Sequence, residues 1–372
     1  MCIKIYSFFS GLGFLDLGFE DEGFDIVFVN EYNKSFLDAY KYARKKMNYN
    51  PPKNGYYQGS LDDLFRGKLN EELTRNVKSD KEEGLVGFIG GPPCPDFSVA
   101  GKNAGITGEN GRLTESYKRI ILKHEPDFFL FENVKGLWST QKHREEYERI
   151  KRAFVRKGYI LIDKLINSLE YGVPQERERV LLFGIRKDVI DDERKSAKKY
   201  LMNNFKWNSN LFNIENIKLL NWPNKTPFQR DALLEMPDNI QEELTVEYWF
   251  RKNDVYMHPN ANDYFRPVSI RRFETIEEGD VSKKSFKRLH RWRFSPTVAY
   301  GNNEVHLHPY KERRLSVAEA LAIQSLPKEF EVLPTLSLSE KFKMIGNGVP
   351  YLVAKETAYE IKKFLQENEE RR

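Results

Sequence analysis

Short apolar runs alternate with helical patterns through the first half of the chain, and no other feature constrains the fold as much. The apolar runs, each typical of a buried strand, occupy residues 3–9, 25–29, 85–89, 127–131, 159–167 and 180–185, with a short further strand inside 55–65. Helical patterns occupy residues 35–47, 70–83, 113–124 and 141–158. Because strand–helix–strand units build parallel sheets covered by helices, this order predicts an α/β fold with a mostly parallel sheet and helices on both faces.

The composition is typical of a soluble globular protein. Of 372 residues, 40% are hydrophobic and 31% are charged, and no apolar run approaches the ~20 residues that a membrane helix needs. A strand pattern begins at the first residues, which leaves no room for a signal peptide. The two cysteines, Cys2 and Cys94, are too few for a disulfide framework or a multi-cysteine zinc site. We therefore expect a cytoplasmic protein with no membrane or metal partner, and its net charge of +5 weakly favours anionic partners.

The strand–helix alternation ends near residue 190, and the following stretch is aromatic, polar and rich in turns. The sequence thus predicts a first domain at 1–190, a smaller irregular domain at 191–328, and a segment at 329–372 that returns to the first domain. The densest basic segment, residues 283–293, interleaves cations with aromatic side chains. That mixture suits binding to a nucleic-acid backbone, and a solvated charged helix is the alternative.

Cys94 lies between two prolines, directly after the apolar run at 85–89. Pro93 and Pro95 fix two φ angles and so hold the thiol on a rigid segment of backbone. Open α/β sheets place their sites at the carboxyl ends of strands, where this cysteine lies. The pattern therefore indicates either a catalytic nucleophile or a buried, inert thiol.

Two further strand ends carry groups suited to a nucleoside cofactor. The run at 3–9 is followed by Ser10-Gly11-Leu12-Gly13, a turn that presents backbone N–H groups at a helix N-terminus. The run at 25–29 is followed by Glu31, which can bind both hydroxyls of a ribose, and by Tyr32, which can stack on an adenine. A tight connection and a solvated glutamate are the alternatives, but the two features together favour the cofactor.

Charged side chains at two more strands favour acid chemistry. Glu132 follows the run at 127–131, and this strand should lie beside the one that precedes Cys94. The pair suggests a nucleophile with an acid partner, and a helix N-cap is the alternative for the glutamate. Arg177 and Arg179 are two residues apart at the start of a strand, so both should point to one face and could grip a carboxylate or phosphate, with ordinary exposed charges at a sheet edge as the alternative.

Regular structure returns at the C-terminal end. Ser316 with Glu319 three residues later forms a capping-box pattern at the start of a helix. Gly346-Asn347-Gly348 then precedes an amphipathic helix and is predicted to form another turn with free N–H groups.

In this order, the motifs resemble those of the DNA cytosine-5 methyltransferases, most closely the bacterial restriction-modification type. The matching motifs are Ser10-Gly11-Leu12-Gly13, Pro93-Cys94, Glu132-Asn133-Val134, Gln175-x-Arg177-x-Arg179, Arg314-Leu315-Ser316 with Glu319 and Gln324, and Gly346-Asn347-Gly348-Val349. They span nearly the whole chain except about 190–295. The resemblance implies a Rossmann-like S-adenosylmethionine-dependent methyltransferase fold with a smaller target-recognition domain.

Four positions depart from the family pattern. The family usually has aspartate where Ser7 stands, a second glycine at Phe14, and glutamine at Pro95. An acidic residue expected to contact the adenine is replaced by Ser60, with two aspartates just beyond. The departures concern cofactor contacts and leave the catalytic motifs intact.

The resemblance also implies roles for individual residues. The catalytic residues would be Cys94, Glu132, Arg177 and Arg179. The cofactor, S-adenosylmethionine, would contact Phe9, Ser10, Gly11, Leu12, Gly13, Glu31, Tyr32, Ser60, Pro93, Asn347 and Val349. DNA would contact Ser98, Gly101, Lys287, Arg288, Arg291 and Arg293.

In the implied reaction, the Cys94 thiolate adds to C6 of a cytosine flipped out of double-stranded DNA, while Glu132 shares a proton with N3. Arg177 and Arg179 would hold the base edge, and the glycine-rich segment 101–111 would close over the site. We expect a monomer, with a cognate restriction endonuclease as a further partner. The competing readings are a transfer-RNA methyltransferase, a catalytically silent DNA-binding protein and a nicotinamide dehydrogenase.

Overall fold

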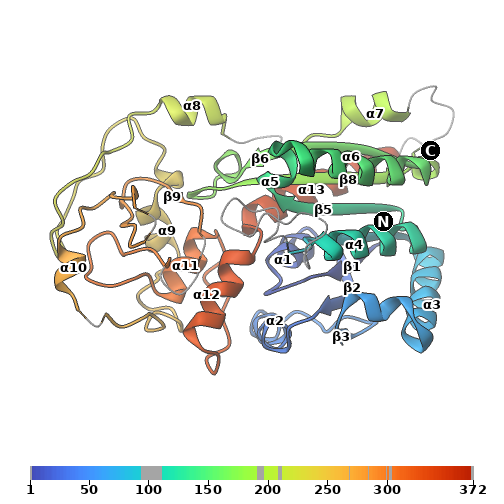
Figure 1. Cartoon of the computed structure of the whole chain (residues 1–372), viewed down its shortest axis with the longest axis horizontal. Coiled ribbons are helices and arrows are strands. Elements are labelled where there is room, and N and C mark those ends of the chain that lie inside the picture. The colour runs from blue at the N-terminus through green and yellow to red at the C-terminus, as the bar shows by residue number, and fades with distance from the viewer. Residues whose placement is uncertain are drawn as a thin grey trace.

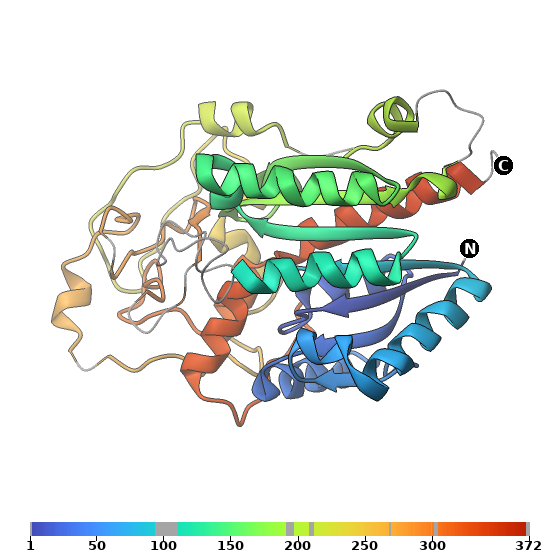
Figure 2. The ribbon, with the colours of Figure 1, turned by 45° about the vertical axis from the view of Figure 1, so that its right-hand side comes forward.

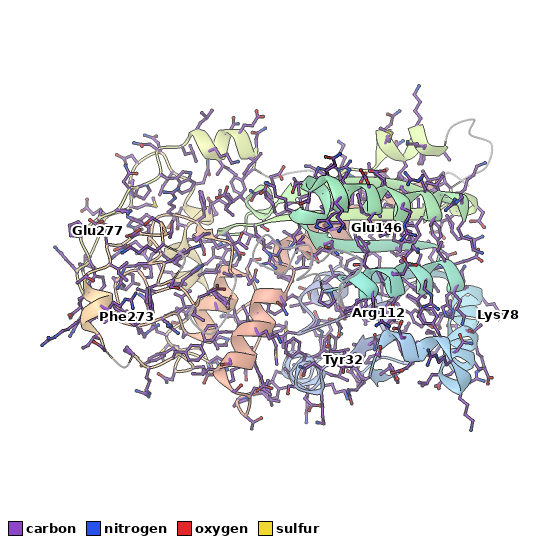
Figure 3. All side chains as sticks on the ribbon, viewed as in Figure 1. Tyr32, Lys78, Arg112, Glu146, Phe273 and Glu277 are labelled. Carbon is purple, nitrogen blue, oxygen red and sulfur yellow. The ribbon has the colours of Figure 1, made fainter. Side chains whose placement is uncertain are left out.

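A computed structural model describes residues 2–93, 111–190, 197–207, 212–267, 269–283, 285–298, 300 and 304–369. The described chain forms a large lobe built on a seven-stranded sheet and a smaller, irregular lobe beside it (Figure 1). Phe273 and Glu277 lie at the outer end of the small lobe, and Lys78 lies at the opposite end of the molecule (Figure 3). None of the helices in these ranges is long and apolar enough to cross a membrane.

The sheet of the large lobe has the strand order β3-β2-β1-β4-β5-β8-β6. Its strands are β1 (Ile3–Phe8), β2 (Asp25–Glu31), β3 (Tyr56–Gln58), β4 (Leu85–Gly90), β5 (Phe128–Val134), β6 (Tyr159–Asn167) and β8 (Glu178–Arg186). Strands β1 to β5 are parallel to one another, and β8 runs antiparallel between β5 and β6. The prediction of a mostly parallel α/β sheet is confirmed.

Two helical layers bury the apolar faces of this sheet (Figure 2). One layer contains α3 (Gly67–Glu83), α4 (Gly111–His124) and α6 (Gln141–Arg156), whose apolar residues join one core with Phe88 and Phe129. The other contains α1 (Phe14–Asp21), α2 (Lys34–Lys46), α7 (Ala197–Asn204) and the C-terminal α13 (Tyr351–Glu369). Short helices η1 (Leu61–Phe65), α5 (Lys135–Ser139), η4 (Ser168–Tyr171) and η5 (Lys187–Val189) connect these elements.

The small lobe has little regular structure. Its elements are α8 (Ile214–Leu219), η6 (Glu242–Leu244), α9 (Val246–Lys252), α10 (Arg271–Glu274), β9 (Ser295–Pro296), α11 (Val317–Ile323) and α12 (Leu338–Asn347). One core combines residues of α9, α11 and α12 with Phe14 of α1 and Phe36 of α2, so the lobes share buried apolar contacts. A two-stranded parallel pair, β7 (Gln175–Glu176) with β9, also joins the lobes.

Two features differ from the sequence-based expectation. Helix α7 contributes Ala197 and Leu201 to the core of the large lobe, so we propose that the first domain continues to about Trp207. Gly346 and Asn347 are the last residues of α12, because the helix continues through them, and they do not form a separate turn. The predicted capping box of Ser316 and Glu319 at the start of α11 is confirmed.

Candidate active site and cofactor site

The carboxylate of Glu132 lies at the edge of the sheet that faces the small lobe. It is placed there because β5 pairs in parallel with β4, whose last residue, Gly90, lies opposite Phe131. The chain leaving β4 passes directly over this carboxylate: a Cβ added at Gly91 would be 2.7 Å from Glu132 Oε2. Glycine at 91 therefore gives the acid room beside the segment that leads to Cys94.

Arg179 holds Glu132 in place across the antiparallel pair. Val134 lies opposite Arg179 in the β5–β8 register, so Arg179 and Glu132 are diagonal neighbours on one face. Arg179 Nε and Glu132 Oε1 are 3.1 Å apart, and both side chains are largely buried. Burial raises the pKa of Glu132, while the charges of Arg179 and Arg177 oppose that rise. A buried carboxyl with a raised pKa, next to an arginine that stabilises its ionised form, is suited to give up and take back a proton.

Arg177 has a different environment from the one expected, because it is fully buried and bound to the protein's own backbone. Its Nη1 donates to Val298 O at 3.3 Å, and its Nη2 donates to Gly346 O at 3.0 Å and Gly348 O at 3.1 Å. Contact of Arg177 with a substrate base therefore stays a prediction, since the described donors of this guanidinium are engaged by the protein's own backbone. Through these bonds Arg177 links the sheet to the small lobe and to the end of α12.

Two glutamines complete this link, and sequence reasoning assigned them no role. Gln175 Nε2 donates to Gln324 Oε1 at 3.1 Å, and Gln175 Oε1 accepts from the backbone N–H of Val298 at 3.2 Å. Gln324 Nε2 in turn donates to Ile345 O at 2.6 Å. Both glutamines belong to the motifs found in the sequence. They lie 149 residues apart in the chain, and no local pattern indicated that they are hydrogen-bonded to each other.

The glycine turn after β1 has the geometry of a ligand-binding loop. Phe9 and Gly11 have positive φ angles of 55° and 57°. Phenylalanine rarely adopts this conformation, and such strain concentrates at ligand sites. A Cβ at Gly11 would meet no atom within 4 Å, so the loop faces open space, while Leu12 is buried below it. Gly13, also at positive φ, precedes α1 as its N-cap and has no side-chain cap of its own.

Glu31 connects this loop to the end of β2. Its Oε2 accepts from Gly11 N at 2.8 Å, and its Oε1 accepts from Asn33 N at 2.8 Å. A carboxylate can accept about four hydrogen bonds, so lone pairs remain for the hydroxyls of a bound ribose. Burial raises the pKa of Glu31, and the backbone N–H donors oppose that rise. Tyr32 protrudes beside it, 72% exposed (Figure 3).

These groups fit a nucleoside cofactor. Ser10 Oγ is buried and, within the described part of the chain, has no hydrogen-bond partner, which leaves a polar atom available to a ligand. The segment around Val349 reaches the same region because Gly348 packs against the ring of Phe14 at the start of α1. Val349 is buried, and Asn347 is exposed at the end of α12.

Ser60 and Pro93 are less clearly placed as cofactor contacts. Ser60 Oγ accepts from Asp62 N at 3.2 Å and caps η1, so this hydroxyl already has a structural partner. Asp62 in turn accepts from Ser116 Oγ at 2.5 Å. Pro93 is exposed at the end of the described segment that follows β4. Contacts of these residues with a cofactor stay predictions.

The structure explains how two departures from the family pattern are accommodated. Ser7 Oγ donates to Asp16 Oδ1 at 2.8 Å, so a carboxylate from α1 lies beside the position where the family usually has one on β1. Phe14 fits because Gly348 has no side chain: a Cβ at Gly348 would lie 2.2 Å from the Phe14 ring. Neither change leaves a gap or a clash at the cofactor loop.

The two arginines of the basic segment that were expected to contact DNA, Arg288 and Arg291, are buried in the small lobe, and their contact with DNA stays a prediction. Arg288 is fully buried and donates to backbone carbonyls, among them Ile276 O at 2.8 Å and Phe273 O at 2.6 Å. Arg291 is 5% exposed and pairs with Glu278 at 2.8 Å. Both arginines hold irregular backbone together, because this lobe has few strands and helices to do so. Lys287 and Arg293 are partly exposed, and their contact with DNA stays a prediction.

Cys94, Ser98 and Gly101 lie outside the described residues, as does most of the segment 101–111 predicted to close over the site. The described residues therefore define the acid, its arginine and the cofactor loop, and they include the backbone up to Pro93.

The C-5 cytosine-specific DNA methylase family model matches residues 3–363. Type II methyltransferase M.NmeDI of Neisseria meningitidis serogroup C is 53% identical over 369 residues, which cover 99% of this chain and 85% of that protein. Type II methyltransferase M.FnuDI of Fusobacterium nucleatum is 30% identical, covering 99% of this chain and 96% of that protein.

Among solved structures, a prophage-encoded Escherichia coli protein assigned as a DNA modification methyltransferase matches with a TM-score of 0.66 and 21% identity, over 98% of this chain and 100% of that chain. Spodoptera frugiperda DNMT2 matches with a TM-score of 0.56 and 16% identity, over 98% and 99%. These structural matches concern the fold. With the family model spanning nearly the whole chain, the protein belongs to the C-5 cytosine-specific DNA methylases and is a DNA cytosine-5 methyltransferase of the restriction-modification type.

Proposed function

We propose that this chain methylates C5 of a cytosine extruded from a specific site in double-stranded DNA, with Cys94 as nucleophile and Glu132 as acid. The observation that carries the proposal is the position of Glu132, buried beside Arg179 and directly under Gly91. Cys94 follows Gly91 by only three residues, a stretch that spans at most about 11 Å, and this short connection supports the assignment of Cys94 as the nucleophile that works with Glu132.

The chemistry assigns a distinct task to each group. Cytosine C5 is a poor nucleophile until the ring is activated. The Cys94 thiolate adds to C6 while Glu132 gives a proton to N3, and the electron pair moves to C5. Once C5 carries the methyl group, a base takes the C5 proton, its electron pair expels the Cys94 thiolate from C6, and N3 returns its proton to Glu132, which restores the aromatic ring. Arg179 stabilises Glu132 in its ionised form.

We assign the cofactor site to the loop after β1 and the end of β2. S-adenosylmethionine, when bound, supplies a methyl group activated by a sulfonium. Glu31 would accept from its ribose hydroxyls, Tyr32 would cover its adenine, and the unpartnered hydroxyl of Ser10 offers a further polar contact. Leu12 and Val349 would contribute apolar walls.

The small lobe is proposed to read the DNA sequence, with Lys287 and Arg293 near the phosphate backbone. Extrusion of the target base from the duplex costs on the order of a few kcal/mol of free energy, and contacts between the protein and the DNA backbone must offset this cost. We further propose that the chain acts as a monomer and that a restriction endonuclease recognises the same site, as the restriction-modification type implies.

Bisulfite sequencing of DNA from cells that express the chain tests the proposal directly. Wild-type protein should protect one cytosine in a fixed sequence context, and Cys94→Ser should abolish that protection while the purified variant still binds the same duplex. Methylation by Cys94→Ser at the wild-type rate would contradict the covalent mechanism. Transfer RNA, assayed in parallel with tritiated cofactor, should remain unlabelled.

A further inference from the structure

A buried group of charged residues lies beneath the cofactor loop, and none of its members takes part in the proposed chemistry. We call Asp16, Glu20, Tyr40 and Arg44 the loop support. Asp16 and Glu20 lie on α1, and Tyr40 and Arg44 lie one turn apart on α2. Arg44 is 2% exposed and Asp16 is fully buried.

Arg44 contacts the loop and α1 at the same time. Its Nη2 donates to Gly13 O at 2.5 Å, and its Nε lies 2.5 Å from Glu20 Oε2. Its guanidinium also stacks on Tyr40, 4.5 Å from the ring centroid. The planar, forked guanidinium can make these contacts together, and a lysine ammonium cannot.

Gly13 is pressed directly against this support. A Cβ at Gly13 would lie 2.5 Å from the Tyr40 ring and 2.8 Å from Arg44 Nη2. The Tyr40 hydroxyl donates to Asp16 Oδ2 at 3.0 Å, which fixes the ring against the start of α1. The backbone of the loop thus packs against Tyr40 and Arg44 at Gly13, whereas at Gly11 it faces open space.

Stability alone is a poor explanation for this cluster. Burial of charged groups is costly, and buried ion pairs can often be replaced by apolar residues of similar volume without loss of stability. Within this cluster Arg44 donates to the carbonyl of Gly13, two residues after the N–H that Gly11 donates to Glu31, and Glu20 and Tyr40 in turn contact the guanidinium. A shift of this carbonyl would move the Gly11 N–H and the carboxylate together.

We propose that Arg44, held by Glu20 and Tyr40, is a positioning residue that fixes the cofactor loop in its binding conformation. The inference rests on the proposed assignment of S-adenosylmethionine to this loop. The loop is thereby ordered before the cofactor arrives, so less binding free energy is spent on ordering it.

Calorimetric titration of the full-length protein with S-adenosylmethionine, without DNA, tests the inference. Arg44→Met should raise the Kd at least 10-fold, and Arg44→Lys, which keeps the charge but not the fork, should raise it less. In steady-state assays, the KM for the cofactor should rise in parallel, while kcat at saturating cofactor stays within 2-fold. Unchanged Kd values in both variants would overturn the inference.

Lys4→Met is the matched control for lost stability. Lys4 lies on β1, the strand that precedes the cofactor loop, but at the end of that strand away from the loop. Its side chain is 3% exposed and pairs with Asp80 at 3.0 Å. This variant should lower the melting temperature as Arg44→Met does and leave the Kd within 2-fold of wild type. An equal rise in Kd for both variants would mean that general destabilisation weakens binding, and the inference would fail.

Two further variants keep the outcomes separate. Tyr40→Phe replaces Arg44→Met if the latter does not fold, because it removes only the hydroxyl bonded to Asp16. This variant should raise the Kd about 3-fold, and an unchanged Kd would overturn the inference.

Glu31→Ala tests the cofactor site itself. Lost binding in Glu31→Ala with normal binding in Arg44→Met would refute the positioning role alone, whereas normal binding in Glu31→Ala would refute the site and the inference with it.

Discussion

Glu132 shows how a single carboxyl is prepared for proton exchange by its surroundings. Burial favours the neutral form and raises its pKa, and the ion pair with Arg179 at 3.1 Å favours the charged form. Neither influence alone would suit a group that must give and then recover a proton. The sequence indicated the acid from its position at a strand end, but the arginine partner depends on a strand pairing that only the fold establishes.

Glu132→Gln should reduce methyl transfer by about 10²- to 10⁴-fold, because the amide keeps the shape of the side chain and cannot supply the proton. Single-turnover assays with tritiated cofactor and duplex DNA measure this rate. Glu178→Gln is the control, since Glu178 is a neighbouring glutamate that pairs with Lys135 near the surface. A Glu132→Gln rate equal to that of the control would contradict the acid role.

His306 predicts a specific dependence of stability on pH. It is fully buried in the small lobe, and burial, with a smaller effect of Lys287, lowers its pKa to about 3. The unfolded chain therefore binds a proton near pH 6.5 that the folded chain rejects, so the contribution of His306 is complete above that pH and is lost as the pH falls.

Between pH 7.5 and 5.5, wild type should lose about 1.4 kcal/mol more of its free energy of unfolding than His306→Asn does. Urea unfolding of both proteins at the two pH values measures the difference. Equal losses in the two proteins would show that His306 takes up a proton in the folded state.

At the scale of elements, most helices and strands of the large lobe follow from the sequence. Strand β6 and the capped start of α11 are predicted from apolar runs and from one capping-box pattern. Two features differ from the sequence-based expectation for tertiary reasons. Gly346 and Asn347 complete α12 because Phe342 and Ile345 are anchored in the core, and α7 joins the large lobe through Leu201.

The contact between Phe14 and Gly348 shows that two elements far apart in sequence have adapted to each other. Gly348 has φ −65° and ψ 148°, a conformation open to any residue, so space and not backbone freedom requires glycine there. Gly348→Ala should therefore reduce the free energy of unfolding by about 1–3 kcal/mol through overpacking.

The same substitution in a Phe14→Ala background should cost less than about 0.5 kcal/mol, because the clashing ring is gone. Chemical denaturation of the four proteins in this double-mutant cycle gives the coupling energy. Additive losses would mean that Phe14 is not the group that restricts position 348.

At the scale of the whole molecule, the two lobes are joined through buried polar contacts as well as apolar ones. The β7–β9 pair, Arg177 and the glutamine pair connect the sheet, the small lobe and α12. The sequence predicted that two domains exist and that basic residues between 283 and 293 face DNA. It could not reveal that Arg288 and Arg291 are internal, since the composition of a segment does not show which cations an irregular lobe needs for its own backbone.

Arg177 and Arg179 are two residues apart, and the structure predicts opposite consequences for their loss. Arg177→Met removes the guanidinium that donates to the carbonyls of Val298, Gly346 and Gly348, and a carbonyl that is left unpaired away from water costs about 1–3 kcal/mol. The joint between the lobes should weaken, so differential scanning calorimetry should show an earlier, split transition. Arg179→Met removes only the partner of Glu132, which can take up a proton in response, so a single transition should remain while methyl transfer falls. A single transition at the wild-type temperature for Arg177→Met would show that the apolar contacts alone hold the lobes together.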